Sequence, residues 1–500
     1  MYKEWWLELY RENPEHIFVE TALVFFVLWL LFVRRTVDPV KTSDVDRFTD
    51  KEVAWLVDTW EPEPLVPDEA TVRDERRAHG SKMVVEAVKG NYLTVAGIET
   101  PVLNLGSYDF LNQAENKETK KSAEKTLLKY GVGSCGPRGF YGTIDLHLQF
   151  EDEIAKHMGT QEAISYSDGA SAVSSTITAF AKRGDLLLVD EACGEPVRTG
   201  ATLSRARVHY FKHNDMDNLS MVMSSIAADD NRLKRDSSQQ RRFIIVEGLY
   251  KKTGNICPLP ELMKLKEKFC YRIVLDESLS FGCLGETGKG VTELFNVPIA
   301  DVEMLVIGMG ATLASVGGVS LGSREVVDHQ RLSGPGYCFS ASAPPVFSTA
   351  ALSALAVLQD RSAGGKLLTA LHKNCVAMQS ELSAIPGLVL VTKGANPILH
   401  LSLDRSDRSV SSALSGLTGE ELWDAEESIV FDIVNDCVNN GVGVTFSILQ
   451  NDWIQEYAKS DSSIRPSLRV CVSSKLLQKE IKLTGKVLKE ATARSLKSKK

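Results

Sequence analysis

The sequence predicts an α/β fold with a parallel or mixed sheet, a large domain and a smaller one beside it. Short, strongly apolar runs alternate with helical stretches from about Tyr92 onward. Runs this apolar suit strands covered on both faces, and their spacing leaves room for crossover helices. The length of 500 residues is also too great for one ordinary core.

The N-terminal segment is expected to be a membrane anchor. Residues 17–33 are apolar apart from Glu20 and Thr21. The span is marginal, because a full crossing needs about 20 apolar residues. A cleaved signal peptide is the alternative, but the preceding region is acidic and no small-residue cleavage site follows. Arg34 and Arg35 follow directly, so the positive-inside rule places the large C-terminal part in the cytosol.

A charged, proline-containing stretch with Trp55 and Trp60 follows, and we interpret it as a linker and docking arm. The predicted strands of the large domain are 163–166, 185–190, 242–247, 272–276 and 304–308. A helix is predicted from Pro345 to Leu358. A second unit has candidate strands at 388–391, 398–403 and 468–472 and ends in a charged helix. The predicted divisions are an anchor at 1–41, a linker at 42–91, a large domain at 92–358 and a small α+β domain at 359–500.

Charge and cysteine content exclude several classes of function. A net charge of −8 and a pI near 5.7 give no general affinity for polyanions, and we expect no nucleic-acid partner. The nine cysteines are odd in number, scattered and without a Cys-x-x-Cys pair. This pattern favours reduced thiols in a cytosol-facing protein and gives no sign of a metal site.

Two glycine-rich segments resemble nucleotide-binding motifs without matching them. Residues 131–136 fit G-x-G-x-x-G, but they follow a helical stretch and run into Pro137 instead of opening a helix. We therefore favour a glycine-rich loop at a subunit contact over a dinucleotide site. Residues 282–290 have the wrong spacing for a P-loop around Lys289.

One segment lacks a residue type that its surroundings lead us to expect. No lysine occurs between Gly290 and Gly365. Within this gap, an apolar strand at 304–308 is followed by a turn of small residues that contains Ala311 and ends on a glycine pair. In addition, Asp276 closes a predicted strand, where a carboxylate would face a ligand crevice. A generic strand-end aspartate is the alternative.

Taken in order, seven blocks resemble the α-oxoamine synthase family of pyridoxal 5'-phosphate enzymes, over about Asn104 to Ser474. These blocks are 131–142, 143–147, 167–169, 184–190, Glu247, 276–277 and 282–290. The resemblance implies the PLP-dependent transferase fold type I, which is aminotransferase-like. It also implies that Asp276 matches the aspartate that keeps the cofactor's pyridinium nitrogen protonated.

Three positions depart from the family pattern. The resemblance places a ring-stacking histidine at Gly194, a second histidine at Leu279 and the cofactor-binding lysine at Ala311. Without an ε-amine no covalent link to the cofactor can form, and the base for α-carbon chemistry is lost with it. We therefore expect no catalytic residue in this chain and only a vestigial role for Asp276.

Residues 328–345 are similar to the non-catalytic long-chain-base subunits of this family's heterodimers. The resemblance implies a lysine-bearing catalytic long-chain-base subunit that binds pyridoxal phosphate covalently and condenses L-serine with palmitoyl-CoA. It further implies the endoplasmic reticulum membrane, small activating membrane subunits and Orm-type regulators. The alternatives are a self-sufficient synthase with a lysine from elsewhere, such as Lys289, and a membrane scaffold that only binds.

The same resemblance suggests interface residues. Family dimers share an active site across the interface, so Ser340 and Ser342 are expected to contact the phosphate of the partner's cofactor. The alternative is that they only shape a turn. Gly133, Cys135 and Arg138 are expected to border the same cavity. Arg469 matches a substrate-binding arginine, but here we favour a structural ion pair.

Overall fold

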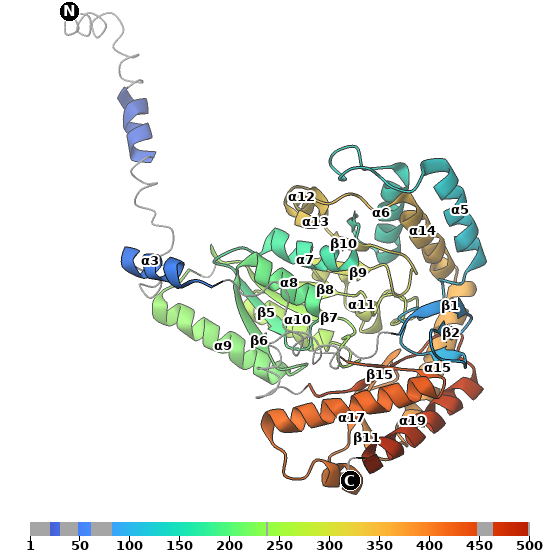
Figure 1. Ribbon diagram of the computed structural model, residues 1–500. Helices are drawn as coiled ribbons and strands as arrows, with labels where there is room; N and C mark the ends of the chain where they lie inside the picture. The colour runs from blue at the N-terminus through green and yellow to red at the C-terminus, as the bar shows by residue number, and fades with distance from the viewer. Residues whose placement is uncertain (1–20, 31–48, 62–82, 237–238, 448–463, 499–500) are drawn as a thin grey trace, which may run out of the picture. The chain divides into compact units, whose positions relative to one another are not determined.

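The computed structural model describes residues 21–30, 49–61, 83–236, 239–447 and 464–498 (Figure 1). The chain divides into two compact units, Met1–Asp74 and Glu75–Lys500. Each unit is described by itself below.

The first unit contains two described helical segments. Residues 21–30 are helical with exposed side chains. Helix α3 (Asp50–Thr59) begins with a capping box, in which the Glu52 N–H donates to Thr49 Oγ1 and the Thr49 N–H donates to Glu52 Oε2. The predicted span at 17–33 lies partly outside the described residues. Within the described ranges, no helix combines the length and the apolar character that a bilayer crossing requires.

The second unit is built on a seven-stranded mixed sheet, which confirms the predicted sheet type. Its order is β4 (Glu162–Tyr166), β10 (Gly318–Gly322), β9 (Met304–Gly308), β8 (Arg272–Asp276), β7 (Arg242–Glu247), β5 (Leu186–Asp190) and β6 (Arg207–Phe211). Strand β10 is antiparallel to both of its neighbours, and the pairs from β9 to β6 are parallel. Almost all residues of the central strands are buried, as their apolar runs predicted.

Two strands of this sheet were not predicted. β6 is an edge strand with the mixed sequence Arg-Val-His-Tyr-Phe, so it lacks a continuous apolar run. β10 is bounded by Gly318 and Gly322 and carries Ser320 at its centre. Its hydrophobic content is too low to mark a strand, although all five residues are buried between β4 and β9.

Helices connect and cover the strands. The helices up to Ser333 are α5 (Lys117–Tyr130), α6 (Asp145–Met158), α7 (Gly169–Phe180), α8 (Glu195–Ser204), α9 (Met216–Leu233), α10 (Leu259–Phe269), α11 (Val291–Leu294), the 3₁₀ turn η3 (Ile299–Asp301) and α12 (Arg324–Ser333). They are followed by α13 (Pro335–Cys338), α14 (Pro345–Gln359), α15 (Ala363–Leu382), α16 (Arg408–Ala413), α17 (Gly419–Asn439) and α19 (Gln478–Ser498). The structure confirms the predicted helix after Pro345 as α14, which packs against α5 and α6, and the predicted charged C-terminal helix as α19.

Two four-stranded sheets complete the unit. One has the order β1 (Val85–Lys89), β2 (Tyr92–Val95), β3 (Val102–Asn104) and β13 (Val442–Gly443). The other has the order β11 (Leu388–Leu390), β12 (Ile398–Leu403), β15 (Leu468–Cys471) and β14 (Thr445–Phe446). Strand β1 falls inside the predicted linker 42–91, so part of that linker belongs to a sheet. The division of the remainder at 358 stays a prediction.

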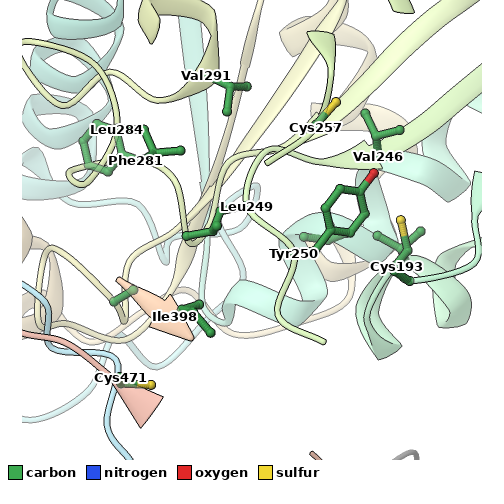
Figure 2. Packing of buried hydrophobic residues seen from close by; sticks show 14 of the residues in the cluster. Cys193, Val246, Leu249, Tyr250, Cys257, Phe281, Leu284, Val291, Ile398 and Cys471 are labelled. Carbon is green, nitrogen blue, oxygen red and sulfur yellow. The ribbon is translucent and has the colours of Figure 1, made fainter. Parts of the chain in front are cut away.

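The buried side chains of the second unit form one continuous cluster (Figure 2). It joins Leu249, Tyr250 and Phe281, which follow strands β7 and β8 of the seven-stranded sheet, to Ile398 of β12 and Cys471 of β15. Each fully buried side chain of this size contributes about 1.5–3 kcal/mol relative to an exposed one. The predicted large and small domains therefore share a core. All nine cysteines are unpaired, as predicted.

Candidate functional site

A cavity of about 620 Å³ opens where the central parallel strands end. Glu247 ends β7, Asp276 ends β8 and Gly308 ends β9, while helices α7 and α8 begin at the same place. Carboxyl ends of parallel strands meet at one edge of a sheet and form the usual ligand crevice. The lining comprises Ser107, Tyr108, Asp109, Gly169, Ala170, Val173, Gly194, Glu195, Pro196, Glu247, Leu249, Lys251, Asp276, Ser278, Leu279, Gly308, Gly310 and Ala311.

The cavity brings together four positions that the sequence singled out. Gly194, Asp276, Leu279 and Ala311 all line it, although they are spread over more than 100 residues of sequence. Ala311 is buried, and its carbonyl accepts a hydrogen bond from the Phe110 N–H at 3.4 Å. Three of the four side chains are apolar or absent, so only Asp276 offers a titratable group.

Glu247 occupies space beside Gly194. The Gly194 N–H donates to Glu247 Oε1 at 2.5 Å, and a Cβ atom at position 194 would lie 3.0 Å from the same oxygen. That separation is tighter than an ordinary contact, so a larger side chain at position 194 and the present placement of Glu247 compete. The sequence indicated Glu247 only as a strand-end residue of the family pattern, and no signal in it pointed to this contact.

Glu247 and Asp276 form a buried pair of carboxyl groups. They are register partners on the parallel strands β7 and β8, and both are buried. Burial raises the pKa of Glu247 to about 7, and the neighbouring Asp276 carboxylate raises it as well. Burial also raises the pKa of Asp276, although the Ser278 hydroxyl and N–H stabilise its charged form. The two carboxyl groups therefore titrate as a pair, and both hold their protons at a higher pH than exposed carboxyl groups do.

This pair should make the protein less stable as the pH rises. A carboxyl group with a raised pKa in the folded state contributes stability below its unfolded pKa of 4.5 and loses it as the pH approaches about 7. Between pH 4.5 and 8, we expect the free energy of unfolding to fall by about 1–3 kcal/mol less in Glu247→Gln than in the wild type. The amide oxygen of the glutamine can still accept from the Gly194 N–H. Denaturant unfolding across this range measures the effect, with exposed Glu86→Gln as the control. Parallel pH profiles for wild type and Glu247→Gln would exclude the raised pKa.

Comparisons with known proteins identify the family. The model of the aminotransferase class I and II family matches residues 100–474. The chain belongs to this family. It is 35% identical to serine palmitoyltransferase 1 of Dictyostelium discoideum over 488 residues, 97% of this chain and 95% of the relative. It is 41% identical to long chain base biosynthesis protein 1b of Oryza sativa subsp. japonica over 399 residues, 80% of this chain and 79% of the relative.

Solved structures of the family show the same fold. A serine palmitoyltransferase from Sphingomonas wittichii superimposes with a TM-score of 0.72, at 22% identity, covering 87% of this chain and 99% of that chain. An 8-amino-7-oxononanoate synthase from Francisella tularensis gives a TM-score of 0.61 at 20% identity, covering 79% and 98%. The predicted aminotransferase-like fold of pyridoxal-phosphate enzymes is therefore confirmed for this chain.

The residues present do not fit a covalently held pyridoxal phosphate. Asp276 would suit a ring nitrogen, but Ala311 offers no amine. The start of α7 would be the natural phosphate site of this cavity, since helix N-termini bind anions. There the Asp168 side chain already accepts from the Ser171 N–H at 2.7 Å and would repel a phosphate. The described lining therefore offers no amine at position 311, and the start of α7 is already capped by Asp168.

Two lysines can be compared with the amine expected at position 311. Lys289, which the sequence offered as an alternative, lines a separate cavity. Lys251 lies at the wall of the present one and is exposed. It follows β7 and not the turn after β9, so its amine approaches from a different element than the one that carries Ala311.

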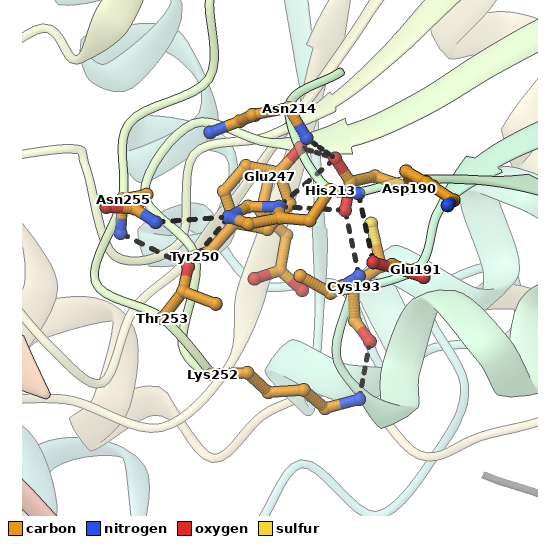
Figure 3. Close-up of polar contacts among 12 residues, drawn as sticks. Asp190, Glu191, Cys193, His213, Asn214, Glu247, Tyr250, Lys252, Thr253 and Asn255 are labelled. Atoms are coloured by element: carbon orange, nitrogen blue, oxygen red, sulfur yellow. Dashed lines mark hydrogen bonds and ion pairs between the residues drawn. The ribbon is translucent and has the colours of Figure 1, made fainter. Parts of the chain in front are cut away.

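A buried network fixes the loop that carries Gly194 (Figure 3). The Asp190 carboxylate accepts from Tyr250 OH at 3.1 Å and lies 3.0 Å from His213 Nδ1. Lys252 Nζ donates to the Cys193 carbonyl at 2.9 Å. These contacts tie the end of β5 to the segment after β7, so the network has a structural role.

Ser340 and Ser342 differ in their surroundings. Ser342 is buried, and its hydroxyl lies 2.8 Å from the Gly136 carbonyl and 2.5 Å from the Gly142 carbonyl. Its single proton is therefore already engaged within the chain. Ser340 is partly exposed, and its Oγ lies 3.0 Å from Ser167 Oγ, just before α7. Its hydroxyl also donates to the Ala341 carbonyl at 3.2 Å, so the difference between the two serines is one of exposure. A contact between either serine and a partner's cofactor stays a prediction.

The glycine-rich loop before α6 is anchored from within. Arg138 is buried and makes a bidentate ion pair with Glu151, at 2.7 and 3.0 Å, and a hydrogen bond to Ser165 Oγ at 2.6 Å. Its side chain therefore points away from solvent. Cys135 is exposed with φ 58°, and a Cβ atom at Gly133 would meet open space. For Gly133, Cys135 and Arg138 the interface stays a prediction.

Arg469 contacts an aromatic ring where we expected an ion pair. Its guanidinium carbon lies 4.5 Å from the centroid of the Tyr108 ring, and Nη2 donates to the Gly106 carbonyl at 3.2 Å. Nη1 also hydrogen bonds to Tyr108 OH. No carboxylate among the described residues pairs with it. Among the described residues Arg469 positions Tyr108 on the cavity wall by a cation–π contact, and the expected ion pair stays a prediction.

Proposed function

We propose that this chain is the non-catalytic, structural and regulatory subunit of a serine palmitoyltransferase. That transferase condenses L-serine with palmitoyl-CoA to 3-ketosphinganine, the first step of long-chain-base synthesis. The observation that carries the proposal is Ala311, buried in a family cavity without an amine at the attachment position. The relatives named serine palmitoyltransferase 1 and long chain base biosynthesis protein 1 support the reaction.

A lysine-bearing partner would supply the chemistry and hold pyridoxal phosphate covalently. An exposed apolar surface supports such pairing. We define the loop patch as Val132, Phe140, Tyr141 and Phe339, whose exposed fractions are 76%, 70%, 104% and 88%. Hydrogen bonds from Ser342 join the two loops that carry these side chains. Large exposed apolar groups of this kind mark interaction surfaces.

Expression with and without the catalytic partner tests the function. We expect no condensation of L-serine with palmitoyl-CoA by the purified chain alone, and full activity when the lysine-bearing subunit is co-expressed. Borohydride treatment of the isolated chain with pyridoxal phosphate should leave no cofactor on a lysine. Turnover by the chain alone, or a reduced adduct on Lys251 or Lys289, would establish the self-sufficient synthase instead.

Separate serine variants test the shared active site. We expect Ser340→Ala to weaken pyridoxal phosphate binding by the assembled pair about tenfold, since it removes one hydrogen bond to a charged group. The pair should remain assembled. Ser342→Ala should instead lower the stability of the chain by about 1–3 kcal/mol, because it removes the buried hydroxyl that lies between the Gly136 and Gly142 carbonyls and can donate to one of them. Unchanged cofactor affinity in Ser340→Ala would withdraw the phosphate contact.

The same proposal places the complex in the endoplasmic reticulum membrane with its large part facing the cytosol. The apolar residues 17–33 and the arginines after them support this location. Small activating membrane subunits and Orm-type regulators would be further partners. Removal of residues 1–41 should release the chain from membranes on carbonate extraction. Release of the intact chain under the same conditions would contradict the anchor.

A further inference from the structure

A second cavity lies apart from the site described above. Its volume is about 900 Å³, and it forms between the glycine-rich loop 282–290, the end of α14 and the first turns of α15. Four cationic side chains line it against a single carboxylate, Glu286. The cations are Lys289, Arg361, Lys366 and Lys373. The whole chain carries a net charge of −8, whereas the side chains that line this cavity carry a net positive charge.

These four cations have no ion-pair partner among the described residues. Elsewhere basic groups find carboxylates, as Arg405 and Arg465 do with Glu426. Like charges gathered around one concave surface repel each other and raise the local positive potential. Such a potential favours binding of an anion, which would relieve the repulsion.

The glycine-rich loop presents Lys289 from a fixed backbone. The Glu293 carboxylate accepts from the Lys289 N–H at 3.1 Å and from the Thr287 N–H at 3.0 Å. The Gly282 N–H donates to the Gly288 carbonyl at 2.6 Å. Gly282 and Gly288 adopt φ values of 74° and 80°, a conformation that side chains resist. The loop is thus held through backbone contacts, and the side-chain amine of Lys289 remains available to a ligand.

An unsatisfied polar atom lies in the same cavity. His157 lines it, and its Nε2 atom is buried without a hydrogen-bond partner. Burial lowers the pKa of His157 to about 4, and the charge of Lys289 lowers it as well, so the ring is neutral at pH 7. A neutral imidazole can donate one hydrogen bond to a ligand oxygen. Buried polar atoms without partners are rare in folded proteins and call for an explanation.

We propose that this cavity binds a phosphate-bearing ligand through Lys289, Arg361, Lys366 and Lys373. The first amides of α15 take no part, because the Ser362 and Ala363 N–H groups already donate to Asp360 Oδ1. Side chains supply the contacts, and charge-assisted hydrogen bonds to phosphate are the strong kind. The proposal depends on no part of the proposed acyltransferase function.

Calorimetric titration of the full-length chain tests the site, with sodium pyrophosphate and glycerol 3-phosphate as separate probes. We expect at least one probe to bind, and Lys289→Gln with Lys373→Gln to weaken it by about tenfold or more. The matched control, Lys482→Gln with Lys486→Gln, removes the same charge from exposed positions of α19 and should leave binding unchanged. Circular dichroism verifies that each variant is folded.

A double variant that keeps both positive charges tests the site even if the glutamine variant is unstable. Lys289→Arg with Lys373→Arg should retain most of the affinity. Tighter binding of pyrophosphate identifies a diphosphate ligand, and tighter binding of glycerol 3-phosphate identifies a phosphate monoester, such as a lipid headgroup. The proposal is overturned if neither probe binds, or if the α19 control weakens binding as much as the cavity variant does.

Discussion

Arg138→Ala is expected to lower the free energy of unfolding by about 3–5 kcal/mol, because it leaves a buried charge on Glu151 without its partner. Both side chains are almost inaccessible, with exposed fractions of 5% and 9%. The same variant removes the donor that reaches Ser165 Oγ and so frees the loop from β4. Denaturant unfolding of the full-length chain, followed by circular dichroism, measures the loss.

Two matched variants distinguish the effect of leaving the Glu151 charge unpaired from the effect of removing an arginine side chain. Arg232→Ala breaks an exposed pair with Asp229 and should change stability by less than about 1 kcal/mol. Arg138→Met with Glu151→Met removes both charges and should be considerably milder than Arg138→Ala. If the single and the double variant lose the same stability, the buried charge of Glu151 is not the cause.

Phe140→Glu combined with Phe339→Glu should abolish pairing with the catalytic subunit, with a loss in affinity of about 100-fold or more. Both rings are exposed in this chain, so the substitutions remove no intrachain packing. In a protein interface the new carboxylates would be buried without partners. Co-purification and condensation activity should fall together, while the unfolding midpoint of the isolated chain stays the same.

The control for this surface is Met221→Glu on α9, which also replaces an exposed apolar side chain by a carboxylate. Pairing should be unaffected there. If the loop-patch variant still assembles and turns over normally, the catalytic subunit does not bind at these loops. Reduced pairing in the α9 variant as well would show that added negative charge, and not the position, is responsible.

Much of the fold could be read from short-range patterns. The strands 242–247 and 272–276 are apolar on both faces, and that requirement is local to each strand. β10 was missed since its burial comes from neighbours on either side and not from its own sequence. Strand β1 was also not predicted. Its five residues are exposed and show no buried apolar pattern, and it is a strand only through its pairing with β2.

The sequence by itself determined which residues could carry chemistry. The lysine-free stretch, Gly194 and Leu279 are matters of residue identity, which needs no coordinates. Their convergence on one cavity with Asp276 and Ala311 follows from parallel strands that end at a common edge, and the structure shows it.

Only the tertiary structure decided where the side chains point. In the structure Arg138 points inward to Glu151, and the Ser342 hydroxyl lies between two loop carbonyls. Glu247 lies beside Gly194. Each of these outcomes depends on a partner from a distant segment. A side chain takes the direction in which its polar group is satisfied and its apolar part is packed, and the chain's three-dimensional course sets both conditions.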